Sequence, residues 1–458
     1  MSTAPRRIVI VAWHFPPSDE IAGRITWRLA RQLALSGCDV LVLAPPLTAI
    51  LARDETYASS LPVGLRVLRT GMRRSLLSYL VTIKRGLRQL VGGRGALAES
   101  APVDAASAPA PVVVPSAGMK QYVIEIVRSL PDSGRGWITT AAQELRRVLQ
   151  EQPVDLVLSV SPALSAHLAV ARADPAAFGV PWFAWSHDPE ALNPFMARLP
   201  KWRNRLTARW EEAALRKADQ VLVTSAQIAQ AYGTLFPGVR APLVMSCGFD
   251  RDEILAAPSP APRSYLLIAH VGTLYGHRTA RPVVEAIARL LASGKLQEGE
   301  LKLKIVGKLE NSDSTELPAL ISRLGVASSV EVLPPVSHAR AQQIAADADV
   351  GLILAEQQPL QVPAKLFECI GLARPMLALA EGATADLIRD AGIGLVCDRA
   401  QLEDSLLQLL QQWRLDRLQS YQVPLQQAAH HFNMQSIAAT LLDRADQARA
   451  HPLREAAG

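Results

Sequence analysis

A lysine and a glutamate three residues apart are the clearest candidate site in the sequence. Lys365 and Glu368 lie in the segment Val362–Glu368 (VPAKLFE), after an apolar run typical of a buried strand. Residues three apart share one face of a helix, so both side chains can reach one ligand from its first turn. A cation suits phosphate and a carboxylate suits ribose hydroxyls, as a nucleotide sugar requires. The alternative is a surface ion pair; the position after a buried strand favours the binding site.

A glycine-rich turn is a second candidate for binding phosphate. The segment His270–Arg278 (HVGTLYGHR) lies between an expected strand and an expected helix. Backbone amides, the helix dipole and the Arg278 cation could together hold a diphosphate. In the alternative interpretation, Gly272 and Gly276 only give the turn its shape.

Two other glycine-containing loops also precede helices. Gly23, near the end of the loop Phe15–Arg24, could let backbone amides at the next helix start approach a substrate, although an ordinary turn would use the same glycine. Gly382 and Thr384 lie in the turn Glu381–Ala385, whose amides would be free to meet a phosphate or sugar.

A histidine and an aspartate follow an expected strand at Ser186–Pro189 (SHDP). At the end of a strand, His187 and Asp188 can bind or deprotonate hydroxyl groups. The same residues before a proline also form ordinary polar turns, with the aspartate as a cap.

Other chemistries have little support. Asp-x-Asp, a pattern that can hold a divalent cation, occurs at Asp250–Asp252 and Asp347–Asp349, but so short a pattern arises easily by chance. The second copy precedes its strand, so we expect it at the end of the sheet away from the ligand. There is no phosphate loop of the Gx4GK[ST] type and no G-x-S-x-G nucleophile motif. We therefore expect neither a metal nor a cofactor.

Alternating strands and helices must position these loops. Apolar runs at Arg7–Ala12 and Asp39–Leu43 flank a helical segment, which makes a parallel βαβ unit. The alternation resumes at Val154–Val160, Pro181–Ser186 and Asp219–Ser225. From Tyr265 it continues through the strands YLLIAHVG, LKLKIVG, VEVLPPV, VGLILA and PMLALA. The pattern predicts an α/β protein with two doubly wound, Rossmann-like domains.

The length and a composition change fix the expected domain boundaries. A chain of 458 residues is too long for one core at ~150 to 200 residues per domain. The segment Ala256–Arg263 (AAPSPAPR) separates a first domain, 1–255, from a second, 264–458, whose last helix is a candidate to return to the first. We expect ligands in a cleft lined by the carboxyl ends of both sheets.

Composition indicates a globular protein of the reducing cytoplasm. Apolar residues make up 49% and charged residues 20% of the chain, and the net charge is +6. This excess suits phosphate-bearing ligands but does not indicate nucleic acid. The four cysteines are scattered, and neither a signal peptide nor an apolar run of ~18 residues is present, so any membrane association would be peripheral.

Two segments of the first half differ from the regular alternation. Val103–Ala117 is rich in Ala, Pro, Ser and Val, which predicts a flexible insert at about 95–118. Arg66–Arg94 holds eight Lys or Arg and no acid among apolar residues, which favours a basic amphipathic helix. Such a helix could dock on anionic lipids at the inner membrane face or simply be solvated.

The order and spacing of several segments carry a family resemblance. IVIVAWHFPPSDEIAGRITWRLARQLALSG, PWFAWSHDP, the CGFD turn, HVGTLY, LKLKIVG and VPAKLFECIGLARPMLAL resemble the retaining GT-B glycosyltransferases of glycosyltransferase family 4. The likeness spans almost the whole chain. It is closest to members that act in bacterial surface polysaccharide synthesis.

The resemblance implies a role for each candidate residue. Glu368 would contact the ribose of a UDP- or GDP-type sugar donor, Lys365 and Arg278 its diphosphate, and Gly272 would form the phosphate turn. Further donor contacts would come from Thr273, Lys308, Leu366, Gly382 and Thr384. The first domain would bind a carbohydrate or polyprenyl-linked acceptor. There Gly23 would approach the donor phosphates, and His187 or Asp188 the transferred sugar or acceptor hydroxyl.

Three departures from the family pattern keep alternatives open. Leu360 replaces an acid eight residues before Glu368, Thr273 replaces an arginine, and Cys247 replaces an asparagine. The resemblance also implies that the leaving phosphate helps to deprotonate the acceptor, with its charge stabilised by cations and helix N-termini. We therefore expect a metal-independent retaining hexosyltransferase. The rivals are a sugar-nucleotide epimerase of the same fold and a non-catalytic binding subunit.

Overall fold

The computed structural model describes residues 5–54, 57, 61–73, 126, 130–193, 196, 199–254, 263–310 and 312–450. The chain divides into two compact units. Unit 1 comprises Met1–Leu222, Tyr232–Leu243 and Leu441–Gly458, and unit 2 comprises Val223–Ala231 and Val244–Thr440. The boundary expected at 256–263 therefore differs from this division, because residues 244–254 group with unit 2.

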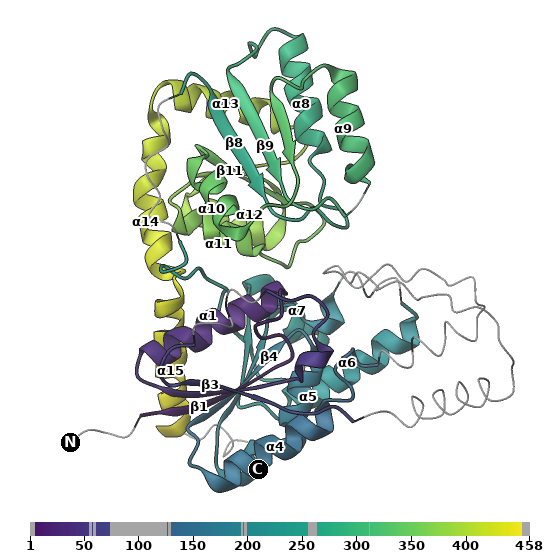
Figure 1. Ribbon diagram of the computed structural model, residues 1–458, viewed down its shortest axis with the longest axis vertical. Helices are drawn as coiled ribbons and strands as arrows, with labels where there is room; N and C mark the ends of the chain where they lie inside the picture. The colour runs from purple at the N-terminus through teal and green to yellow at the C-terminus, as the bar shows by residue number, and fades with distance from the viewer. Residues whose placement is uncertain are drawn as a thin grey trace, which may run out of the picture. The chain divides into compact units, whose positions relative to one another are not determined.

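Unit 1 is built on a seven-stranded sheet with the order β3-β2-β1-β4-β5-β6-β7. The central strand β1 pairs in parallel with β2 and β4, with Ile8 opposite Val40 and Leu156. Helix α1 covers one face, and α4 and α5 cover the other (Figure 1). The elements are β1 (Arg7–Ala12), α1 (Ile21–Leu35), β2 (Asp39–Ala44), β3 (Leu65–Arg69), α4 (Ile138–Glu151), β4 (Leu156–Ser161), α5 (Leu164–Ala173), β5 (Trp182–Ser186), α6 (Lys201–Leu215), β6 (Gln220–Val223), α7 (Ala226–Leu235) and β7 (Leu243–Val244).

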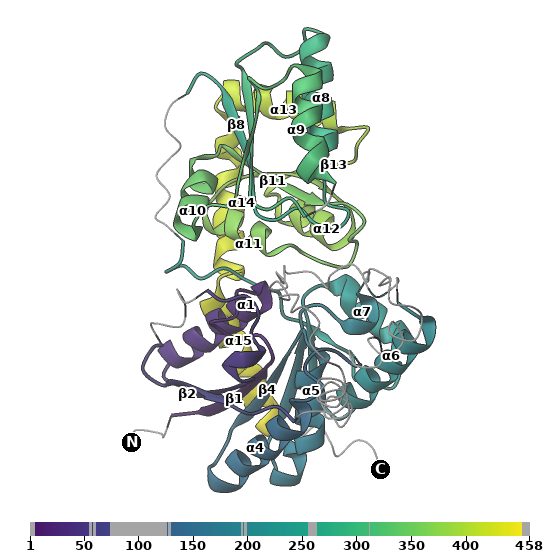
Figure 2. The same cartoon turned by 45° about the vertical axis from the view of Figure 1, so that its right-hand side comes forward.

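Unit 2 is built on a six-stranded sheet with the order β10-β9-β8-β11-β12-β13. Alternate residues of β8 face opposite sides: Leu266 and Ile268 pack against α8, α9 and α13, whereas Leu267 and Ala269 pack against α10 (Figure 2). The elements are β8 (Leu266–Val271), α8 (Arg281–Ala292), β9 (Leu301–Val306), α9 (Asp313–Leu324), β10 (Val330–Leu333), α10 (His338–Asp347), β11 (Val350–Ala355), α11 (Ala364–Gly371), β12 (Met376–Ala380), α12 (Gly382–Ala391), β13 (Gly394–Cys397), α13 (Leu402–Arg414), α14 (Gln422–His431) and α15 (Met434–Ala450).

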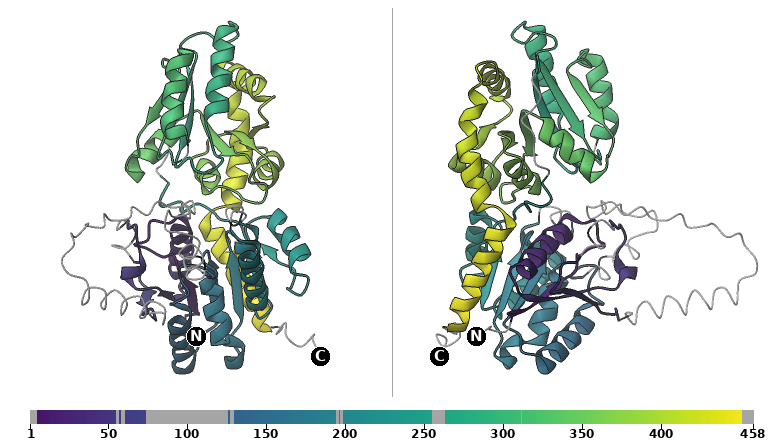
Figure 3. Two further views of the ribbon diagram at one scale, coloured as in Figure 1. Left: turned by 90° about the vertical axis from the view of Figure 1, so that its right-hand side faces the viewer. Right: turned by 60° about the vertical axis from the view of Figure 1, so that its left-hand side comes forward.

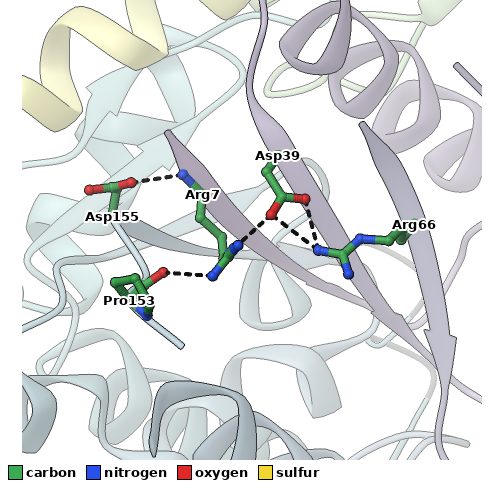
Figure 4. A network of polar contacts seen from close by, with 5 residues as sticks. All are labelled: Arg7, Asp39, Arg66, Pro153 and Asp155. Carbon is green, nitrogen blue, oxygen red and sulfur yellow. Dashed lines mark hydrogen bonds and ion pairs between the residues drawn. The ribbon is translucent and has the colours of Figure 1, made fainter. Parts of the chain in front are cut away.

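Charged residues tie together the amino ends of the strands in unit 1 (Figure 4). Arg7 binds Asp39 through Nε at 2.7 Å, and Arg66 binds the same carboxylate at 2.8 Å. Although burial opposes the effect, these two guanidinium groups hold the pKa of Asp39 below its ordinary value. The backbone N–H of Arg7 also donates to Asp155 at 2.7 Å. The network therefore lies at the amino ends of the strands, whereas the ligand-binding loops expected of this fold follow their carboxyl ends.

This network corrects part of the predicted basic helix. Arg66 and Arg69 belong to strand β3, and residues 70–73 are not helical. The prediction of a helix over 66–94 is therefore wrong for its first residues, because β3 extends the sheet and Arg66 pairs with Asp39. Residues 74–94 and the expected insert at 95–118 lie outside the described residues.

The end of helix α15 lies against unit 1 (Figure 3). Asp446 accepts a hydrogen bond from Arg6 at 2.7 Å, and Arg449 donates to Asp155 at 2.5 Å. These contacts explain why residues from Leu441 onward group with unit 1.

The prediction of two doubly wound α/β domains is confirmed. The predicted strands are present within about three residues of their expected bounds, the largest difference being at the end of β10, whereas β3, β7 and β13 had not been predicted. Among the helices within the described ranges, none combines the length and apolar character needed to cross a membrane.

Candidate functional site

The candidate residues of unit 2 meet where the strand order reverses. After β8 the chain proceeds to β9 and β10 on one side, and after β11 to β12 and β13 on the other. Loops that leave two adjacent strands in opposite directions open a crevice at their carboxyl ends, where doubly wound sheets bind ligands. The loops after β8 and β11 and the start of α11 all contribute to this point.

Lys365 is held by a histidine of the central strand. The β8–β11 register ends with Gly351 opposite Ala269, and at the next residue the Leu352 carbonyl bonds Nδ1 of His270 at 3.0 Å. Because a carbonyl only accepts, Nδ1 must carry the proton, which leaves Nε2 to accept from Nζ of Lys365 at 3.1 Å. The tautomer of His270 is thus fixed, and with it the direction of Lys365.

Burial changes the charge state of this pair. Desolvation lowers the pKa of Lys365 to about 7, and the Arg278 cation adds to the effect while the nearby Glu368 carboxylate opposes it. Desolvation, followed by Lys365, also lowers the pKa of His270 well below its ordinary value. The pair therefore consists of a neutral imidazole and an ammonium group that is readily deprotonated. A bound anion would stabilise the ammonium form.

Two glycines make room for the lysine. Gly272 has φ +136°, and a Cβ placed there would lie 2.1 Å from Cε and 2.2 Å from Nζ of Lys365. Gly307, after β9, has the same φ, and its Cβ would lie 2.5 Å from the Gly272 carbonyl oxygen. Side chains rarely adopt this φ, so both turns require glycine. The Lys365 side chain therefore lies directly across the backbone of the glycine turn.

Arg278 provides a second, fixed cation. Its Nη2 and Nε donate to Oε1 of Gln358 at 2.6 and 3.2 Å, and its guanidinium stacks 4.6 Å from the Tyr275 ring centre. Both Arg278 and Gln358 are buried. Gln358 follows β11, so the contact joins the loops on either side of the point where the strand order reverses.

A polar cavity of about 330 Å³ adjoins this cluster. It is lined by residues next to Arg278 and Gln358 in sequence, including His277, Thr279 and Gln357, and by Arg399 after β13. Arg399 is held by Glu356 at 2.7 Å. The lining therefore borders the loops that carry Arg278 and Gln358, and it does not include Lys365, Arg278 or Gln358 themselves.

The turn at Gly382 supports the loop after β11. The Ala383 N–H donates to the Pro359 carbonyl at 2.7 Å, and the buried Thr384 hydroxyl donates to the Gln361 carbonyl at 2.8 Å. A Cβ at Gly382 would lie 2.1 Å from the Pro359 oxygen. The prediction that this turn offers free amides is therefore wrong for Ala383, because the Ala383 N–H already donates to the Pro359 carbonyl.

The remaining unit 2 candidates differ in exposure. Leu366 is fully buried, and its contact with the donor stays a prediction. Glu368 is half-buried in α11, on the same helix as Lys365. Thr273 is half-buried in the glycine turn, and Lys308 is exposed after β9, where its carbonyl accepts from Leu274 N–H at 2.9 Å.

In unit 1, His187 and Asp188 follow β5 as predicted. His187 is buried, and its ring meets Trp185 edge-on at 4.1 Å. Burial, together with the nearby His167, lowers the pKa of His187 to about 3. Since such an imidazole is a very weak base, the geometry favours hydrogen bonding to a hydroxyl over its deprotonation. Asp188 is half-buried.

Gly23 lies in the first turn of α1 and not in the preceding loop. A Cβ there would lie 3.3 Å from the backbone nitrogen of Phe15, so the glycine lets α1 pack closely on the loop after β1. Packing accounts for this glycine, and its approach to donor phosphates stays a prediction.

A buried polar cluster of unit 1 was missed from the sequence. Asp132 accepts from the backbone N–H of Gly134 and of Ser165, at 2.7 and 2.8 Å. Glu211 accepts from the Ala191 N–H at 2.8 Å, and Arg203 donates to the Pro131 carbonyl at 3.0 Å. These residues come from separate segments, so no spacing in the sequence could have identified them.

The Asp-x-Asp patterns have structural roles. Asp250 is buried and caps its own turn by accepting from Asp252 N–H at 3.1 Å. Asp349 accepts from Leu267 N–H at 2.8 Å, which confirms its expected place at the amino ends of the strands. In the part of the chain that the structure describes, no cluster of three or more His, Cys, Asp or Glu could hold a metal ion.

Two family models match the two halves of the chain. Residues 97–248 match the model of a glycosyl transferase 4-like domain, and residues 266–412 match that of glycosyl transferases group 1. The chain is a GT-B glycosyltransferase. No curated protein sequence gives a match to it. The site around Lys365 lies within the group 1 domain.

Solved structures share the fold at low sequence identity. Anabaena HepE, in a complex with UDP, has a TM-score of 0.61 at 15% identity, covering 96% of this glycosyltransferase and 100% of HepE. Sucrose-phosphate synthase from Thermosynechococcus elongatus has a TM-score of 0.61 at 14% identity, covering 97% and 99%. WaaG, a glycosyltransferase involved in lipopolysaccharide biosynthesis, has a TM-score of 0.56 at 16% identity, covering 96% and 99%. Identities this low support a common fold and no more.

Proposed function

We propose that this glycosyltransferase transfers a hexose, with retention and without a metal, from a UDP- or GDP-type donor to a carbohydrate or lipid-linked acceptor. The observation that carries the proposal is the Lys365–His270 pair beside the Gly272 turn. It places a half-buried, oriented ammonium group beside the glycine turn, at the crevice where doubly wound sheets bind nucleotides.

Each part of the donor has a candidate partner in unit 2. Lys365 and Arg278 would bind the diphosphate, since both are cations held in fixed directions. Glu368, on the same helix as Lys365, would accept from the ribose hydroxyls. The cavity beside Arg278 would take a further part of the donor. UDP and UDP-glucose complexes of the similar HepE fold support a nucleotide sugar as donor.

The proposed reaction uses this charge distribution. The bond between the sugar C1 and the diphosphate oxygen breaks, and the nucleoside diphosphate leaves with the electron pair. The acceptor oxygen bonds C1 on the same face, and its proton passes to the leaving phosphate. Lys365 and Arg278 would stabilise the charge that develops on the leaving group, where a prearranged cation is most effective. His187, which stays neutral, would hydrogen-bond a sugar or acceptor hydroxyl.

The cellular setting belongs to the same proposal. We place the enzyme in the cytoplasm, at the inner membrane face, in the synthesis of a surface polysaccharide. WaaG, which shares the fold, is involved in lipopolysaccharide biosynthesis, and this supports a role in a surface polysaccharide. The net charge of +6 suits an anionic membrane surface.

Nucleotide binding tests the proposal. The purified protein is titrated with UDP, GDP, ADP and dTDP while its thermal stability is followed, with EDTA present. We expect one nucleotide to raise the melting temperature, and Lys365→Met and Glu368→Gln to remove most of that shift. Lys295→Met, which removes an exposed lysine of the same unit, is the matched control and should keep it. If no nucleotide stabilises the wild-type protein, the proposed donor site is wrong.

A further inference from the structure

Unit 1 contains a cavity that the proposed donor site does not use. It has a volume of about 200 Å³ and lies between the short helix η4 (Glu190–Leu192) and the first turns of α6. Its polar lining comes from Glu190, Asn193, Arg203, Asn204 and Thr207. The cavity follows β5 closely in the chain, so it belongs to the carboxyl-end loops of the first sheet.

Three polar oxygen atoms in this lining have unmet hydrogen-bonding capacity. Glu190 Oε1, Asn204 Oδ1 and Thr207 Oγ1 are buried, and within the described ranges they have no hydrogen-bond partner. Glu190 is 9% exposed and Thr207 is 2% exposed. Leaving a buried polar group unpaired costs about 1 to 3 kcal/mol. Three such atoms around one cavity indicate a site built for a polar ligand.

The frame of the cavity is fixed by hydrogen bonds among its lining residues and to their neighbours. Asn204 Nδ2 donates to the Met196 carbonyl at 2.6 Å, which leaves Oδ1 as the free end of the amide. The Ala191 N–H donates to Glu211 at 2.8 Å and holds the short helix that carries Glu190. Arg203 is fixed by the Pro131 carbonyl at 3.0 Å. The three oxygens are therefore prearranged before a ligand arrives.

The chemistry of the three oxygens selects the ligand. Burial raises the pKa of Glu190 to about 8, with Asp132 and Glu211 adding to the effect. The protonated carboxyl and the Thr207 hydroxyl can both donate and accept, whereas Asn204 Oδ1 can only accept. A phosphate, which has few or no donors, would leave Asn204 unsatisfied. A group with several hydroxyls, each able to donate and accept, would satisfy all three.

We propose that this cavity binds hydroxyl groups of the carbohydrate acceptor, through Glu190, Asn204 and Thr207. The inference rests on the proposed function, since it names the class of acceptor for that reaction. It also assigns acceptor recognition to side chains of η4 and α6 in unit 1.

Saturation-transfer NMR on the full chain tests this assignment, with methyl glycosides of glucose, galactose, mannose and N-acetylglucosamine as probes. The variants are Thr207→Val, which removes the hydroxyl at nearly constant volume, Thr207→Ser, which keeps it, and Asn204→Leu. Thr140→Val is the matched control, because the Thr140 hydroxyl lies on another helix and already bonds the Trp137 carbonyl at 2.9 Å. Melting temperatures with and without the preferred nucleotide are recorded for every variant.

We expect at least one glycoside to bind the wild type. The loss of one hydrogen bond in Thr207→Val and in Asn204→Leu should weaken binding about 3- to 10-fold. Thr207→Ser and Thr140→Val should bind as the wild type does. The cavity assignment is wrong if Thr207→Val and Asn204→Leu both bind the glycoside as the wild type does. It is also wrong if no glycoside binds to a protein that still responds to nucleotide. Neither result contradicts the proposed function. A protein that responds to no nucleotide contradicts the proposed function instead.

Discussion

Donor affinity should depend on pH through Lys365. The pKa of this lysine is about 7, because burial and the Arg278 cation disfavour the ammonium form. The donor diphosphate would favour that form and raise the pKa in the complex. The complex therefore binds more protons than the free protein above about pH 7. Affinity should be nearly constant at lower pH and should fall as the pH rises through this window.

The size of the effect follows from the protonated fraction of Lys365. With a pKa of about 7, that fraction falls about 15-fold between pH 7 and 8.5, which equals about 1.6 kcal/mol of binding free energy. Two groups close to Lys365, His270 and Cys369, keep one charge state in this range. The pKa of His270 lies well below 6.5, and burial, with Glu368 adding to it, raises the pKa of Cys369 to about 12.

Isothermal titration calorimetry from pH 6 to 9 measures this dependence. The ligand is the nucleotide sugar of the preferred base, without acceptor, because its diphosphate diester has no ionisation in the range. Lys365→Arg keeps its charge throughout and should bind with pH-independent affinity. A wild-type affinity that changes less than twofold between pH 7 and 8.5, or an equal decline in Lys365→Arg, would refute the reasoning.

Four further outcomes follow from the same site. Gly272→Ala should weaken nucleotide binding at least about 10-fold in calorimetry, because its Cβ would displace Lys365. Gly294→Ala is the control: Gly294 also has a positive φ, but a Cβ there would have no described atom within 4 Å. This substitution should cost only about 1 kcal/mol of stability. Arg278→Met should weaken nucleotide binding about 10- to 100-fold, the value of a charge-assisted hydrogen bond. Glu368→Gln should weaken UDP or GDP several-fold in competition experiments and leave inorganic pyrophosphate unchanged, since the carboxylate is assigned to ribose. In chemical denaturation, Lys365→Met should stabilise the unliganded protein at pH 7, and the gain should shrink as the pH rises toward 10.5, because the unfolded wild-type chain binds more protons at this lysine in that range.

The fold could be predicted from the sequence because its strands are short, apolar and regularly spaced. The run at Arg7–Ala12 is fully apolar after its first residue, as expected of a central parallel strand covered on both faces. Strand β3 (LRVLR) lacks that character because it lies at the sheet edge, where Arg66 is exposed and pairs with Asp39 and Arg69 donates to the Pro45 carbonyl. Its charge pattern therefore resembled a basic helix.

The candidate site was predictable only in part, because some of its contacts join segments that are far apart in the sequence. Gly272, Arg278 and Lys365 lie in loops whose position follows from the strand pattern. His270 belongs to the strand itself, and its bond to Lys365 becomes visible only when β8 and α11 are placed side by side. Glu190, Asn204 and Thr207 carry no motif, and their unmet hydrogen bonds exist only in the folded chain.

Acceptor-dependent release of nucleotide tests the central claim most directly. The protein is incubated with the nucleotide sugar of its preferred base, with and without the glycoside that binds best, and both nucleotide release and the anomeric configuration of the product are followed by NMR. The account predicts release that requires the glycoside, a product with the donor's anomeric configuration, and loss of both in Lys365→Met. Equal release without acceptor, an isomerised sugar nucleotide, or turnover that survives Lys365→Met would contradict it.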